Sequence, residues 1–64
     1  MDREADMELL DVAEVAEFLK ISVSGVRRLQ QKRQIPFFKV GGRVRFTRSD
    51  IVEYLKHRRV AAIF

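Results

Sequence analysis

Hydrophobic positions recur with helical spacing directly after Asp11. They fall at i, i+3, i+4 and i+7, on one face of a helix: Val12, Val15, Ala16 and Leu19. Asp11 and Glu14 have the spacing of a capping box, in which each side chain bonds the backbone amide of the other residue. The pattern predicts a short first helix that begins at Val12, buries the apolar stripe and turns Glu14 and Glu17 to solvent.

A second helical pattern follows after roughly three residues. Ser22 is a good N-cap, and the stretch from Val23 to about Arg33 carries Val26, Leu29 and the stem of Arg33 on one face. So short a connection forces two helices to cross steeply, which is the arrangement of a helix-turn-helix.

The other face of the second helix combines arginine and glutamine donors with small residues: Val23, Ser24, Arg27, Arg28 and Gln31. This composition is typical of a helix that reads base edges in the major groove, although two adjacent arginines alone also describe a solvated basic helix. Gly25 costs ~1 kcal/mol relative to Ala inside a helix, so we expect tight packing or a close approach of DNA there.

Beyond Pro36, which ends the helical region, β-forming residues on both sides of Gly41-Gly42 predict a hairpin. A two-residue loop would pair Val40 with Arg43 and mix Lys39 into the apolar face, so we expect an odd-length loop that pairs Val40 with Val44. In that register Phe38, Val40, Val44 and Phe46 face inward, Lys39 and Arg45 face outward, and Arg43 lies at the tip.

Thr47 and Asp50 form another capping-box-like pair, and a third helix follows with an apolar repeat that should close the core over the hairpin: Ile51, Tyr54, Leu55 and Arg58. The apolar stretch 60–64 either extends this helix or covers another surface. The fold class is therefore a small α+β winged helix-turn-helix, with three helices and a two-stranded hairpin wing between helices 2 and 3. We expect a flexible acidic leader at 1–8, a DNA-binding domain at 9–59 and an apolar tail at 60–64.

Length and composition narrow the function classes. A chain of 64 residues forms one domain. Cysteine is absent, which excludes disulfides, thiolate zinc sites and a cysteine nucleophile, and which fits a reducing cytoplasm. No apolar run approaches the ~20 residues of a membrane span, and the acidic N-terminus does not resemble a signal peptide.

Charge is distributed unevenly. Residues 1–19 carry seven acids and one base, whereas residues 20–64 carry twelve bases and two acids. Such a basic block indicates a polyanionic partner, and a membrane surface fits less well because the apolar stripes are needed for a small core. The early acids Asp2, Glu4, Asp6 and Glu8 are interpreted as a solvated tail rather than a metal site.

Catalytic chemistry is not indicated. His57 is the only histidine and lies among bases on a helix, and the glycine pair is not a phosphate-binding loop. We therefore expect no enzyme activity, catalytic residue, metal or cofactor. The candidate DNA-binding residues are Ser22, Val23, Ser24, Arg27, Arg28, Gln31 and Lys32 in the second helix and Lys39, Arg43 and Arg45 in the wing. Lys20 and Arg48 are candidate backbone contacts, and Ile63 and Phe64 candidate partner contacts.

Two segments, LLDVAEVAEFLKISVSGVRRL and IPFFKVGGRVRFTRSDIVEYL, resemble the excisionase-like winged helix-turn-helix proteins, relatives of the DNA-binding domain of MerR-type regulators. The resemblance covers about residues 9–55. The family usually has glycine where Lys20 stands, and Gly25 replaces a small polar residue. The resemblance implies that the second helix enters the major groove and that the wing lies along the adjacent minor groove or backbone.

A stand-alone unit of this size resembles a prokaryotic or phage-encoded excisionase, a recombination directionality factor that binds adjacent DNA sites, bends DNA and directs an integrase towards excision. MerR-type regulators append a dimerisation helix and an effector domain that this sequence does not contain. We expect a free monomer in the nucleoid whose partners are double-stranded DNA, integrase and neighbouring copies. The alternatives are a small transcriptional regulator of the same fold and a protein-interaction adaptor.

Overall fold

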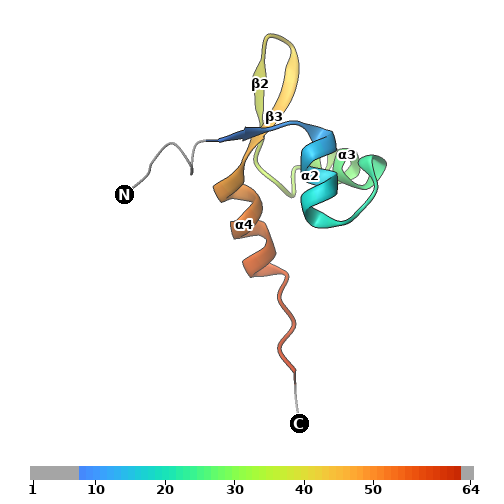
Figure 1. Cartoon of the computed structure of the whole chain (residues 1–64), viewed down its shortest axis with the longest axis vertical. Helices are drawn as coiled ribbons and strands as arrows, with labels where there is room; N and C mark the ends of the chain where they lie inside the picture. Colours follow the sequence, from blue (N-terminus) through green and yellow to red (C-terminus); the bar gives the residue numbers. More distant parts are fainter. Residues whose placement is uncertain (1–7, 63–64) are drawn as a thin grey trace.

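The computed structural model describes residues 8–62, which form a small α+β fold (Figure 1). Its elements in chain order are β1 (Leu9–Leu10), α2 (Val12–Leu19), α3 (Val23–Gln31), β2 (Phe38–Val40), β3 (Arg43–Thr47) and α4 (Arg48–His57). The strands form one antiparallel sheet in the order β1-β3-β2. The arrangement is consistent with a winged helix-turn-helix, as predicted.

Helix starts lie where the capping residues predict them. Asp11 Oδ1 accepts from the Glu14 amide at 2.8 Å, and Glu14 Oε1 accepts from the Asp11 amide at 2.8 Å, so the capping box is complete. Ser22 Oγ accepts from the Gly25 amide at 3.0 Å. Thr47 Oγ1 accepts from the Asp50 amide at 3.3 Å. Each bond satisfies an amide that the first helical turn leaves without a partner.

Helix ends differ more from expectation. The predicted end of α3 near Arg33 is wrong, because α3 ends at Gln31 and Arg33 has a φ of 57°, which no right-handed helix contains. The stem of Arg33 is therefore not part of the buried face. At the end of α2, Lys20 has a φ of 62°, in the left-handed region that favours glycine. The turn between α2 and α3 thus keeps a left-handed residue even though lysine occupies the position.

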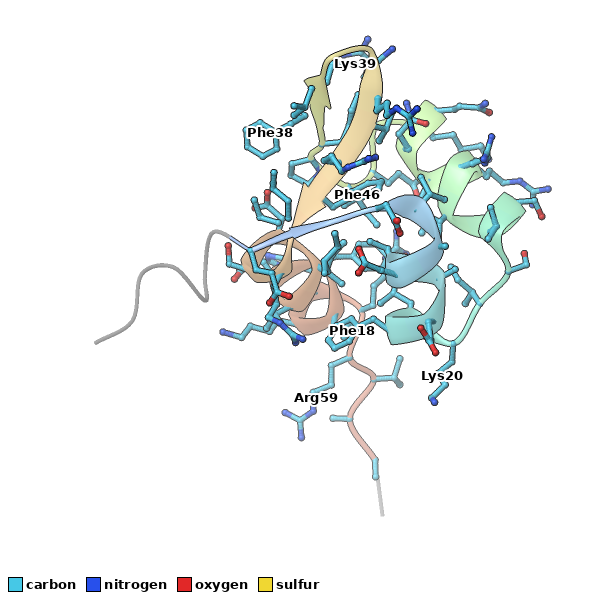
Figure 2. All side chains as sticks on the ribbon, turned by 45° about the horizontal axis from the view of Figure 1, so that its top comes forward. Phe18, Lys20, Phe38, Lys39, Phe46 and Arg59 are labelled. Carbon is cyan, nitrogen blue, oxygen red and sulfur yellow. The ribbon has the colours of Figure 1, made fainter. Side chains whose placement is uncertain are left out.

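The core lies between the helices and the sheet. Its fully buried side chains come from five parts of the chain, with Phe46 of β3 among them (Figure 2): Val15, Val26, Ile35, Phe46 and Ile51. Around them pack Val12, Leu19, Leu29, Phe37, Val44 and Tyr54. The third-helix prediction differs from the structure at Leu55, which is 42% exposed, and at Arg58, which follows the end of α4 at His57. Of the two alternatives for the apolar tail, extension of the helix is not observed in residues 60–62.

A third strand was not expected. Leu9 pairs with Thr47 and Leu10 with Phe46, so β1 extends the predicted two-stranded hairpin at its base. The Glu8 carbonyl accepts from the Arg48 amide at 3.1 Å and continues the contact beyond the strand. Leu10 is buried by this pairing and adds an apolar side chain to the core.

The predicted hairpin register is wrong. Val40 pairs with Arg43, Lys39 with Val44 and Phe38 with Arg45, so the loop contains only two residues. Gly41 and Gly42 have φ values of 57° and 81°, and two consecutive positive φ angles suit the tight hairpin turn whose twist matches that of the strands.

This register changes which side chains face the core. Phe37, not Phe38, packs against it, and Phe38 and Val40 lie on the outer face of the sheet with Arg43 and Arg45. The alternating pattern did not predict the register because the wing projects beyond the helices (Figure 1), where burial does not constrain which side chains face inward.

Candidate nucleic-acid interface

The outward face of α3 is polar and basic. Val26 is buried and Leu29 half-buried, which fixes the rotation of the helix about its axis. The residues that the sequence assigned to the reading face are all exposed: Ser22, Val23, Ser24, Arg27, Arg28, Gln31 and Lys32. Figure 2 shows nitrogen-tipped side chains along the outer side of α3, away from α4.

The start of α3 is tightly packed. Ser22 Oγ, which caps the helix, also lies 3.1 Å from Ser24 Oγ. A Cβ atom at Gly25 would lie 3.3 Å from Ser22 Oγ, closer than most Cβ atoms approach their neighbours, and would contact Ile21 Cδ1 at 3.4 Å. Packing within the turn therefore accounts for a glycine in the first turn of α3, the first of the two reasons expected from the sequence.

A groove separates α3 from the wing and brings candidate residues of both elements together. Arg27 and Gln31 line it from α3, and Arg43 and Arg45 line it from β3. The start of α2 and Val44 complete the lining, together with Gln30. No role was predicted for Gln30 from the sequence. It lies three residues after Arg27, and this spacing makes the two side chains neighbours on a helix.

Arg45 is held along its own strand. Its Nη1 donates to the carbonyl oxygen of Val44 at 2.8 Å, and the side chain is half-buried. This bond satisfies a backbone carbonyl on the part of β3 that β1 does not cover. Arg43, by contrast, is exposed next to the turn. The groove thus contains one oriented guanidinium group and one that is free to adjust.

Lys39 lies on the opposite face of the wing from Arg43. It pairs with Val44, whose side chain packs on the core, and Figure 2 shows it at the tip of the hairpin. Lys39 also borders a second groove beside the connector between α3 and β2. The tip is therefore flanked by a cation on each face.

Two candidate backbone contacts lie apart from this groove. Lys20 is in the turn between α2 and α3, at the end of the molecule opposite Lys39 (Figure 2). Arg48 Nε lies 3.4 Å from Glu8 Oε1, and its guanidinium group lies 5.2 Å from the centre of the Phe18 ring. Arg48 shares its cleft with Glu14 and Glu17, an acidic setting. Ile63 and Phe64 lie outside the described residues.

The charges around the groove favour an anionic ligand. No Asp or Glu occurs between Glu17 and Asp50, a stretch that carries nine Lys and Arg residues and contains α3 and the whole wing. Asp11 is the one carboxylate among the residues that line the groove, and the capping box already engages it. Desolvated phosphate would therefore meet cations and amide donors rather than free carboxylates.

Other chemistry is sparse among residues 8–62. His57 is exposed on α4, where its Nε2 lies 3.3 Å from Glu53 Oε2, and it does not line the groove beside α3. No cluster of three potential metal ligands occurs in this part of the chain, and none of its helices is long and apolar enough to cross a membrane. The acids at positions 2, 4 and 6, interpreted from the sequence as a solvated tail rather than a metal site, lie outside the described residues.

Comparison with known proteins gives one match. No curated protein and no solved structure matches the chain. A family model described as a helix-turn-helix domain, which represents excisionase-like DNA-binding domains that are typically non-enzymatic, matches residues 9–59. That range contains α2, α3, the wing and α4, and therefore the whole groove. The chain belongs to this family of helix-turn-helix domains, whose function is to bind DNA.

Proposed function

We propose that the protein is an excisionase, a DNA-binding factor that directs an integrase towards excision. The observation that carries the proposal is the groove in which Arg27 and Gln31 of α3 meet Arg43 and Arg45 of the wing. A helix and a ribbon that share one basic surface can contact the major groove and the adjacent minor groove of one duplex. The family of excisionase-like domains supports the more specific role.

The two sides of the groove have different tasks in this proposal. Arg27, Arg28 and Gln31 of α3 contact base edges, where a bidentate arginine–guanine pair is worth about 1–3 kcal/mol of discrimination. Arg43 and Arg45 contact phosphates, which provide affinity without sequence information. With roughly five phosphate contacts, the logarithm of affinity should fall against the logarithm of salt concentration with a slope of about −4 to −5.

Several copies bind adjacent sites cooperatively in this account, because one short helix and one wing cover too little DNA for high specificity. The acids of α2 and its N-cap on one copy (Asp11, Glu14 and Glu17) face the bases near the end of α4 on the next (Lys56, Arg58 and Arg59). Both sets are at or near the surface, although Asp11 and Glu14 also bond each other's amides. Val60, which is 91% exposed, begins an apolar tail that contacts the neighbouring copy or integrase.

The test combines gel shifts on duplexes with one, two and three sites and an integrase-dependent excision assay. We expect cooperative filling of adjacent sites by a protein that is monomeric when free. Deletion of residues 60–64 should impair excision more than it impairs binding to a single site. Independent filling together with normal excision by the truncated protein would instead identify a small transcriptional regulator. Salt-insensitive binding would favour a protein-interaction adaptor.

A further inference from the structure

Two large apolar side chains of the wing are largely uncovered. Phe38 and Val40 are 48% and 51% exposed, and the strand register places both on the sheet face opposite the core. Arg45 lies directly across from Phe38, and Arg43 directly across from Val40. Scattered exposed apolar residues are common on proteins, but these two lie next to each other on one face of the same strand and form an apolar patch that a partner could cover.

The charges around these side chains favour DNA as the occupant. Their cross-strand neighbours are both arginines, and Lys39 lies between them in sequence. No carboxylate occurs anywhere in the wing or in its connection to α3. The ligand must therefore combine negative charge with apolar surface. Duplex DNA does so in its minor groove, where phosphates flank deoxyribose carbons and base edges.

The shape of the tip fits the same occupant. Gly41 and Gly42 carry no side chains, and a Cβ atom at either position would have no neighbour within 4 Å. Val40 and Arg43, which pair directly across the strands, are thus the first side chains behind a narrow tip on the outer face, and Val40 is the apolar one. The minor groove of B-DNA is only about 6 Å wide, so a ribbon with side chains enters only if the groove widens. Apolar side chains that enter the minor groove widen it and bend the duplex.

We propose that Val40, supported by Phe38, packs against the sugar and base edges of the minor groove and helps to bend the DNA. This inference rests on the proposed function, because it requires the wing to lie on a duplex. The contact involves no charge, and it therefore raises affinity without changing the number of counterions released. It differs in this respect from the arginines on the same face.

The test compares Val40→Thr with Arg43→Gln and with Leu55→Ala, a control at an exposed apolar residue of α4 outside the groove. Threonine keeps the branched shape and β-propensity of valine, so the melting temperature should stay close to that of the wild type. Affinity for a duplex is measured across a salt series, and bending is measured by energy transfer between dyes at the two duplex ends.

We expect Val40→Thr to lower affinity about three- to tenfold at every salt concentration, with an unchanged slope and a smaller bend. Arg43→Gln should reduce the magnitude of the slope by about 0.9, and Leu55→Ala should change neither quantity. If Val40→Thr binds and bends DNA as the wild type does, the inference is wrong. If this variant loses excision while its DNA binding stays intact, the inference is also wrong, and the face contacts a protein partner instead. If the wild type itself binds no duplex, the proposed function fails as well.

Discussion

The helix pair α2–α3 and the outer half of the wing are stabilised in different ways. The pair contributes Val15, Ala16 and Val26 to the core, and a side-chain cap begins each of its helices. The outer half of the wing, residues 38–43, buries no side chain and depends on strand pairing and a glycine turn. The difference teaches that stability and binding can be altered separately: substitutions of core side chains change stability, whereas substitutions of exposed side chains in the outer wing change binding, and only its glycine turn bears on stability.

Phe46→Ala should have the largest effect on stability. Phe46 is fully buried where the sheet meets the helices, and removal of a buried phenylalanine side chain costs about 3–5 kcal/mol. A domain this small has little stability to lose, so we expect the variant to be largely unfolded. Chemical denaturation followed by circular dichroism measures the loss. Phe38→Ala is the matched control in the wing, and an equal loss there would contradict the comparison.

Asp11→Ala should destabilise the helix pair by about 1 kcal/mol, because it removes the side-chain oxygen that accepts from the Glu14 amide, whereas the backbone amide of residue 11 can still donate to Glu14. The same change removes the one carboxylate among the residues that line the groove, so affinity for DNA at low salt should rise while stability falls. Thermal unfolding and duplex titration of one preparation test both signs. If stability and affinity both fell, the affinity of α3 for DNA would depend more on the support that α2 gives to α3 than on the negative charge of Asp11 in the groove.

Gly42→Ala should cost about 1 kcal/mol, because Gly42 has a φ of 81° and a side chain is strained there. Gly41→Asn provides the control: asparagine tolerates a positive φ and is favoured at the first position of this turn. The melting temperature should fall only for the alanine variant. Equal stability of the two variants would indicate that the turn contributes little to the fold.

Lys20→Gly should have the smallest effect and the opposite sign. Lys20 has a left-handed conformation, which glycine adopts without the steric cost that lysine bears. Part of this gain is offset by the greater conformational freedom of glycine in the unfolded chain, so we expect a stabilisation of roughly 0.5 kcal/mol. A lower melting temperature would mean that the unfolded-state term dominates.

Local signals in the sequence predicted the helix starts, and non-local features were missed. Asp11, Ser22 and Thr47 each act within a few residues of the amide that they cap, so spacing alone revealed them. The two residues of β1 are too few for a pattern, and their burial depends on pairing with β3. The predicted hairpin register was wrong because the glycine pair adopts a two-residue turn, and because few residues of the wing lie over the core, so burial does not enforce the alternating pattern.

The candidate site was predicted in the same uneven way. Helical spacing identified the exposed residues of α3, since Val26 and Leu29 determine which side is buried. Sequence could not give the relative orientation of separate elements. It therefore grouped Arg48 with the DNA-binding cations, whereas the structure pairs Arg48 with Glu8 in a different cleft. It also left out Gln30, which lines the groove.

The central claim is that α3 reads sequence and the wing supplies affinity. The most direct test is to measure affinity for the protein's own site and for a random duplex. The site is obtained by footprinting on DNA next to the gene. The variants are Arg27→Ala and Arg28→Ala in α3 and Arg45→Ala in the wing, with Arg33→Ala as an exposed control outside this groove. We predict that the α3 variants lose about 1–3 kcal/mol of discrimination between the two duplexes and that Arg45→Ala weakens both equally. If Arg27 and Arg28 can both be replaced with that discrimination unchanged, the assignment of α3 as the reading helix is wrong.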